Sequence, residues 1–292
     1  MSKRYYIIPI FVPHKGCPHD CVFCNQKKIT GQIEEVTAAD VTEKIETYLN
    51  TISRENSMLE IAFYGGSFTA IPIDYQKELL QAAFYYVERG LIDSIRVSTR
   101  PDYINKEILE NLKRYGVETV ELGVQSMDEE VLELSNRGHT SLDVIRAVKL
   151  LKEYDFKVGI QMMIGLPGDT CEKSLDTAKR LIELKPDIAR IYPALVIRNT
   201  FMEEMYYSGS YKPLTLQEAV ILSKKLLILF EREGVNVIRI GLQPTENIFM
   251  GKDVVAGPFH PSMRQLVEAL IYREMLEYML NNIKGSKSAV TI

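Results

Sequence analysis

Three cysteines near the start of the chain form the pattern most able to do chemistry. Cys17, Cys21 and Cys24 make a Cys-x3-Cys-x2-Cys triplet directly after an apolar run. Thiolates spaced this closely converge on a metal, a cluster or an oxidant. Three ligands for a cluster of four irons leave one iron without a protein ligand. An open position on a metal centre is typical of a catalytic site, whereas closed sites are usually structural.

Length and composition set the class of protein. The chain has 292 residues, of which 46% are hydrophobic and 25% charged, so it can bury a core of α/β-barrel size. It contains no run of eighteen apolar residues and no secretory signal at its start, so we expect no membrane span. Three of its four cysteines are clustered, which is poor disulfide geometry and predicts a reducing, cytoplasmic setting.

Strand-like apolar runs alternate with amphipathic helical stretches along the whole chain. The periodicity and the Gly and Pro breakers predict strands at 7–12, 59–64, 94–99, 119–124, 157–164, 188–196 and 235–240. They predict helices at 39–52, 75–88, 106–115, 129–135, 142–154, 171–183, 216–233 and 261–281. Repeated strand–helix units imply a parallel sheet with right-handed crossovers, and six or more units favour a complete or partial barrel.

Unusual residues recur where these strands end. The cysteine loop follows the first strand, and Gly65-Gly66 follows the second. Ser98 and Arg100 end the third strand, and Gln125 ends the fourth. The stretch Gly165-Leu166-Pro167-Gly168 follows the fifth. Because the carboxyl ends of barrel strands meet at one rim, we expect these residues to form one site.

Several stretches beside the triplet resemble the radical S-adenosylmethionine superfamily. More closely, the chain resembles the radical domain of the Elongator catalytic-subunit family and its bacterial relatives. The matching stretches are 63–69, 98–104, 121–126, 136–140, 163–168 and 190–196. The resemblance covers about residues 5 to 245. It implies a partial (β/α)6 TIM-like barrel over 1–245, with a short C-terminal extension at 246–292 made of a loop at 251–258 and one helix.

The resemblance also implies the cofactors. A 4Fe-4S cluster would sit on Cys17, Cys21 and Cys24, and its free iron would chelate S-adenosylmethionine. An electron from a donor of flavodoxin or ferredoxin type would cleave the cofactor reductively. The resulting 5′-deoxyadenosyl radical would abstract a hydrogen atom from the substrate, while the protein positions and shields the reaction.

Cofactor contacts follow from residue type. Gly65 and Gly66 let the backbone approach the methionine amino group, and Ser67 stands where many relatives carry an acid. Gln125 has the donor and acceptor capacity that ribose hydroxyls need. We also expect Arg100 to hold the methionine carboxylate by a bidentate contact.

Strand alternation extends this set. It groups Glu121 and Gly123 with Gln125 on one side of their strand, and Arg96 and Ser98 with Arg100 on theirs. The backbone of Gly165, Leu166 and Pro167 is expected along the adenine.

The substrate is open between transfer RNA and a small molecule. The Elongator family modifies wobble uridines and carries a C-terminal acetyltransferase domain, for which we find no room, so a requirement for acetyl-coenzyme A is not inferred. The net charge of −4 argues against a large basic footprint. A local basic patch is expected from Lys27, Lys28, Arg137, Lys157, Arg190, Arg198 and Arg239.

Two other interpretations stay open at this point. The chain could be a non-catalytic iron–sulfur and S-adenosylmethionine-binding protein that regulates or scaffolds a partner. It could instead be a zinc-binding module, with His14 or His19 as the fourth ligand. For two further residues we expect structural roles. Cys171, at a helix start, is expected to be a structural thiol, and His139, between two helices, a surface or hydrogen-bonding residue.

Overall fold

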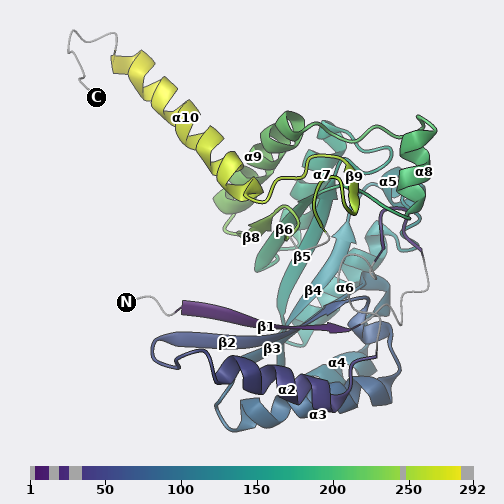
Figure 1. Cartoon of the computed structure of the whole chain (residues 1–292), viewed down its shortest axis with the longest axis vertical. Helices are drawn as coiled ribbons and strands as arrows, with labels where there is room; N and C mark the ends of the chain where they lie inside the picture. Colours follow the sequence, from purple (N-terminus) through teal and green to yellow (C-terminus); the bar gives the residue numbers. More distant parts are fainter. Residues whose placement is uncertain (1–3, 13–19, 26–34, 244–247, 284–292) are drawn as a thin grey trace.

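A curved sheet of seven parallel strands forms the centre of the molecule (Figure 1). The computed structural model describes residues 4–12, 20–25, 35–243 and 248–283. The strands are β1 (Arg4–Val12), β2 (Ser57–Gly65), β3 (Ser94–Thr99), β4 (Val117–Gln125), β5 (Lys157–Ile164), β6 (Ile188–Pro193) and β8 (Asn236–Ile240). Each strand pairs in parallel with its neighbour in the order β1-β2-β3-β4-β5-β6-β8. This succession in one direction, on a curled sheet, confirms the predicted partial TIM-like barrel.

Helices follow the strands, and most of them cover the outer face of the sheet. They are α2 (Ala38–Leu49), α3 (Ile73–Glu88), α4 (Lys106–Arg114), α5 (Glu129–Leu134), α6 (Ser141–Glu153), α7 (Cys171–Glu183), α8 (Phe201–Tyr207), α9 (Leu216–Arg232) and α10 (Met263–Ile283). Capping boxes at Thr37, Thr140 and Thr215 begin α2, α6 and α9. Each box satisfies backbone N–H groups that a helix start leaves without partners, which explains why these helices begin there.

The hydrophobic core lies between the sheet and the helices. Along β2, the side chains of Leu59, Ile61 and Phe63 are fully buried and belong to this core. Glu60 and Tyr64 have the opposite parity and face the concave side of the sheet. The same alternation continues along β3 and β4, so the concave face is polar where the convex face is aliphatic.

Two predictions about the second half of the chain were wrong. The sixth strand ends at Pro193, and the next residues form a separate strand β7 (Val196–Ile197). β7 pairs in antiparallel fashion with β9 (Val254–Ala256), so the predicted loop at 251–258 contains a strand. A three-residue strand is too short to show a period, which is why the sequence did not reveal it.

The helix α10 extends away from the rest of the molecule (Figure 1). Its first half packs against α9, where Lys224 forms an ion pair with Glu274. None of the described helices is both long enough and apolar enough to cross a membrane. The division of the chain at residue 245 stays a prediction.

Candidate functional site

The cysteine loop is held by the connection between α5 and α6. The backbone N–H of Val22 donates to the Ser135 carbonyl at 3.1 Å, and the Asn136 side chain donates to the Asp20 carbonyl at 2.9 Å. Cys21 is buried, with 7% of its surface exposed, and Cys24 is partly exposed. Cys17 lies outside the described residues, as do His14 and His19.

A second segment, between β7 and α8, holds the other side of the loop. The N–H of Met202 donates to the Val22 carbonyl at 2.8 Å. The Asn25 side chain donates to the carbonyls of Arg198 and Asn199 at 3.3 and 3.2 Å. Asn136 in the first segment and Asn199 in this one have left-handed φ angles of 49° and 61°. Asparagine tolerates this conformation, which allows both segments to turn sharply at the loop.

Arg137 connects the cysteine loop to the end of β4. Its Nη1 donates to the Cys21 Sγ at 3.4 Å, and its Nη2 donates to the Gly123 carbonyl at 2.5 Å. The residue is 6% exposed, and its Nε has no hydrogen-bond partner among the described residues. Sequence reasoning had placed Arg137 in a surface patch for RNA, and the structure corrects this.

The turn after β2 depends on glycine. Gly65 has a φ of +117°, and a Cβ there would lie 2.1 Å from the Val12 carbonyl oxygen. Only glycine permits this approach of β2 to the end of β1. Ser67 is buried, and its hydroxyl lies 2.8 Å from the Thr99 hydroxyl and accepts from the Arg100 N–H at 3.2 Å. Ser67 therefore joins the ends of β2 and β3.

Arg100 has a carboxylate partner within the chain. Its Nε and Nη2 donate to the two carboxylate oxygens of Asp102, both at 2.9 Å, and its Nη2 also donates to the Arg137 carbonyl at 2.7 Å. The side chain is 2% exposed. The structure thus shows a bidentate contact of Arg100 within the chain, and its contact with the cofactor carboxylate stays a prediction. Asp102 was not predicted as this partner, although it stands only two residues away from Arg100.

Gln125 ends β4 in a strained conformation. Its φ is +69°, and the pairing of β4 with β5 shifts register between Gly123 and Gln125. Its side-chain oxygen accepts from the Gln161 side chain on β5 at 3.2 Å. Left-handed φ at a residue other than glycine costs energy and is concentrated at functional sites. This strain is an observation in favour of a functional role for Gln125.

The stretch after β5 is also tightly fixed. The Gly165 N–H donates to Asp169 at 2.7 Å, and its carbonyl accepts from the Tyr211 hydroxyl at 2.6 Å. Leu166 packs in a small apolar cluster that also includes Phe23 of the cysteine loop. The structure thereby brings the stretch 165–167 and the cysteine loop together. Ser98, by contrast, is partly exposed, and its side chain forms no hydrogen bond with the described residues.

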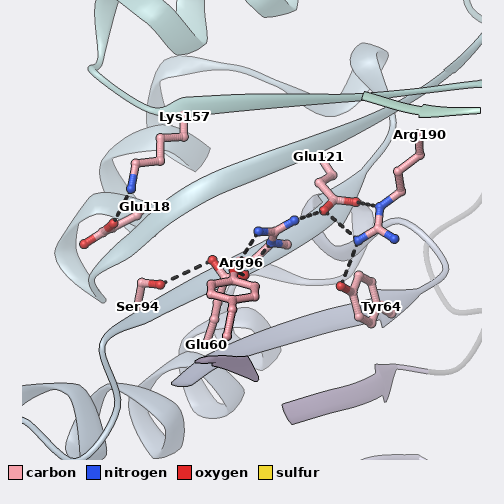
Figure 2. Close-up of polar contacts among 9 residues, drawn as sticks. Glu60, Tyr64, Ser94, Arg96, Glu118, Glu121, Lys157 and Arg190 are labelled. Carbon is pink, nitrogen blue, oxygen red and sulfur yellow. Dashed lines mark hydrogen bonds and ion pairs between the residues drawn. The ribbon is translucent and has the colours of Figure 1, made fainter. Parts of the chain in front are cut away.

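A chain of ion pairs crosses the concave face of the sheet (Figure 2). Arg96 on β3 donates to Glu60 on β2 at 2.7 Å and to Glu121 on β4. Glu121 also accepts from Arg190 on β6, at 2.8 Å to Nε and 3.0 Å to Nη2. Arg190 in turn donates to the Tyr64 hydroxyl at 3.1 Å. We call these four charged residues and Tyr64 the polar ladder.

The polar ladder depends on the space left by Gly159 and on the charges of its two arginines. A Cβ at Gly159 on β5 would lie 2.7 Å from the Glu121 Cγ, so its absence lets Glu121 reach across β5 to Arg190. Burial opposes ionisation of Glu121, but the Arg190 and Arg96 guanidinium groups outweigh it and hold the pKa of the carboxyl below its usual range. Burial raises the pKa of Tyr64 to about 12, so its hydroxyl keeps its proton. The ladder is therefore a fixed, charge-balanced layer.

Two of the five described members of the predicted basic patch lie in the interior instead of on the surface. Arg137 and Arg190 are buried, and Arg190 is paired with Glu121. Lys157 pairs with Glu118 at 3.2 Å on the surface. Arg198 donates to the Lys252 carbonyl. Lys27 and Lys28 lie outside the described residues.

His139 is buried rather than at the surface. Only 4% of it is exposed, between α5 and α6, and the described residues offer neither ring nitrogen a hydrogen bond within normal geometry. Burial, followed by the charges of Arg137 and Arg100, lowers its pKa to about 3. The imidazole is therefore neutral and acts as part of the packing behind Arg137. Cys171 is partly exposed at the start of α7, and among the described residues it belongs to no cluster of three or more His, Cys, Asp or Glu side chains.

Comparison with known families defines the class of this protein. The model of the radical SAM superfamily matches residues 11–181, and the model of the radical SAM C-terminal domain matches residues 186–273. The chain therefore belongs to the radical SAM superfamily and is an enzyme of that superfamily.

Its relatives include proteins of the Elongator type. The chain is 33% identical to an uncharacterised protein of Methanocaldococcus jannaschii, over 73% of this chain and 68% of the relative. It is 30% identical to the tRNA uridine(34) acetyltransferase of the same organism, over 73% of this chain and 47% of that protein. It is also 30% identical to the human Elongator complex protein 3, over 74% of this chain and 48% of that protein. The chain spans about half the length of these last two relatives.

Solved structures share the fold. The archaeal Elp3 of Methanocaldococcus infernus superposes with a TM-score of 0.74 at 24% identity, covering 94% of this chain and 64% of that one. The coproporphyrinogen III oxidase HemN of Escherichia coli superposes with a TM-score of 0.57 at 19% identity, covering 80% of this chain and 54% of that one. Both likenesses agree with the partial barrel described above.

Proposed function

We propose that Cys17, Cys21 and Cys24 hold a 4Fe-4S cluster and that the chain cleaves S-adenosylmethionine reductively. The family implies both cofactors. One structural observation carries the proposal: buried Cys21 lies against the guanidinium of Arg137, which also contacts the end of β4. A 4Fe-4S cluster held by three thiolates carries a net negative charge. The buried Nε of Arg137, which lacks a partner among the described residues, fits an anion beside the loop.

The residues of this chain orient the reactants. When bound, the cluster and S-adenosylmethionine supply one-electron cleavage and hydrogen-atom abstraction. The glycine turn at Gly65 lets backbone approach the methionine end, and Gln125, oriented by Gln161, offers an amide for the ribose. Leu166 and Pro167 provide an apolar surface that would pack along the adenine and exclude water.

Transfer RNA is the substrate that we propose. The support is the set of relatives described as tRNA uridine(34) acetyltransferases and Elongator complex protein 3. These relatives are about twice as long as the matched part, so only the radical step is proposed here, with an electron donor of flavodoxin or ferredoxin type. Acetyl transfer is not included.

Anaerobic reconstitution tests the proposal. Protein reconstituted with iron and sulfide is reduced with dithionite in the presence of S-adenosylmethionine, and 5′-deoxyadenosine is quantified. We expect product from the wild type and from Cys171→Ala, which keeps the triplet, and none from Cys21→Ala. Absence of an iron–sulfur chromophore in the wild type would contradict the proposal and favour zinc. A bound cluster without product, with and without tRNA, would favour the regulatory interpretation.

A second experiment tests whether transfer RNA is the substrate. A tRNA carrying uridine at position 34 should increase the yield of 5′-deoxyadenosine, whereas the same tRNA with cytidine at that position should not. Equal yields with both tRNAs would contradict a uridine substrate and direct the search to small molecules.

A further inference from the structure

Arg137 differs from the other buried arginines in its charge balance. Arg96 forms ion pairs with Glu60 and Glu121. Arg100 forms one with Asp102, and Arg190 forms one with Glu121. Within the described residues, no carboxylate forms an ion pair with Arg137, although it is 6% exposed. A buried cation without a counter-charge is costly, so an anion is expected at this position.

The surrounding backbone fixes the direction of this side chain. The Arg137 N–H donates to the Leu132 carbonyl at 2.9 Å at the end of α5. A Cβ at Gly123 would lie 3.0 Å from the Arg137 Nη2, so glycine leaves the space that the guanidinium fills. With Nη2 on the Gly123 carbonyl, Nη1 faces the Cys21 Sγ at 3.4 Å. In the loaded enzyme this sulfur atom represents a thiolate bound to iron.

We infer that Arg137 donates a hydrogen bond to the Cys21 thiolate and thereby raises the reduction potential of the cluster. This inference rests on the proposed function, because it needs a cluster on Cys21. Reduction adds one negative charge to the cluster, and hydrogen bonds and positive charge at the ligand sulfur stabilise the more negative state. Arg137 is then a tuning residue that makes the first electron easier to accept, and it acts before any substrate binds.

The test measures the potential of the cluster directly. Reconstituted wild type, Arg137→Met and Arg137→Lys are titrated anaerobically without S-adenosylmethionine, and the reduced cluster is followed by electron paramagnetic resonance. S-adenosylmethionine is omitted so that a contact between Arg137 and the carboxylate of that cofactor cannot contribute to the measured potential. Iron and sulfide content are measured in parallel. Arg180→Met is the control, because Arg180 is a partly buried arginine that donates to Met127 and Ser141 and has no contact with Cys21.

We expect Arg137→Met to lower the potential enough to reduce the ratio of reduced to oxidised cluster about tenfold, which is about 59 mV for one electron. Arg137→Lys should lie between the wild type and Arg137→Met, and Arg180→Met should match the wild type. An unchanged potential in Arg137→Met with full iron content overturns the inference.

If Arg137→Met does not retain iron, Arg137→Lys decides, and an unchanged potential there also overturns the inference. A wild type without any cluster would instead contradict the proposed function itself.

Discussion

Replacing Glu121 by Gln should destabilise the protein strongly, because this carboxylate lies at the centre of the polar ladder. It is 5% exposed and accepts hydrogen bonds from both Arg96 and Arg190. The substitution keeps the shape of the side chain and removes its charge. Arg96 still has Glu60 as a partner, whereas the described residues offer Arg190 no second carboxylate.

The size of the effect follows from this asymmetry. Removing one partner of a buried ion pair leaves an uncompensated charge and costs about 3–5 kcal/mol. The amide oxygen of glutamine can keep one of the two hydrogen bonds from Arg190, and a hydrogen bond to a charged group is worth about 1.5–3 kcal/mol. We therefore expect a loss of about 3 kcal/mol, near the lower end of the first range.

Urea unfolding at neutral pH provides the assay. The chain contains no tryptophan, so the transition is followed by circular dichroism at 222 nm. Glu118→Gln is the matched control, because Glu118 lies on the same strand and pairs with Lys157 at the surface (Figure 2). An exposed pair of this kind contributes about 0–1 kcal/mol. A Glu121→Gln variant no less stable than Glu118→Gln would refute the conclusion that the ladder stabilises the barrel.

The pH dependence gives an independent check. The pKa of Glu121 is lower in the folded protein than in the unfolded chain, so its stabilisation is fully present above the unfolded pKa of about 4.3. It is lost as the pH falls through the folded value. The difference in free energy of unfolding between wild type and Glu121→Gln should thus be constant from pH 8 to about pH 5.5 and shrink only below about pH 4.

Three further variants test neighbouring features. Gly159→Ala places a Cβ 2.7 Å from the Glu121 Cγ and should cost about 1–3 kcal/mol in urea unfolding. Gly65→Ala meets the Val12 carbonyl and adopts an unfavourable φ, so its melting temperature, measured by circular dichroism, should fall clearly. His139 has a pKa of about 3 in the fold, so the unfolded chain takes up a proton first as the pH falls below about 6.5. Wild-type stability should therefore decrease between pH 6.5 and 3 more steeply than that of His139→Gln, as urea midpoints at each pH will show.

The strands of the barrel were predictable because most of their residues are apolar and buried. The runs at 94–99 and 157–164 have the same bounds in the sequence and in the structure, and the other five differ by one to three residues at one or both ends. Continuous apolar runs bounded by Gly and Pro are a strong signal for such strands. The pair β7 and β9 depends on a contact between segments about 57 residues apart, and neither segment is long enough to show alternation.

For the candidate site, the sequence predicted only that residues at the carboxyl ends of the strands lie together. Strand parity grouped Glu121 with Gly123 and Gln125 on one strand, and Arg96 with Ser98 and Arg100 on another. It did not predict the ion pair that joins Arg96 to Glu121 in the structure. It could not show that Glu121 also meets Arg190, because that contact depends on the register of β5 and on the space left by Gly159. The contact of Arg137 with Cys21 was likewise hidden, since it joins residues 116 positions apart that share no periodic pattern.

The two segments that hold the cysteine loop have a consequence for the order of biogenesis. Val22 and Asn25 come early in the chain, but their hydrogen-bond partners stand at Ser135 and at Arg198 to Met202. On the ribosome, the cysteine loop is made first, and the last of its supports follows only after some 170 further residues have been added. Iron and sulfide delivered before that point would meet cysteines without their surrounding structure. The chain must therefore complete most of its barrel before the loop reaches the geometry described here.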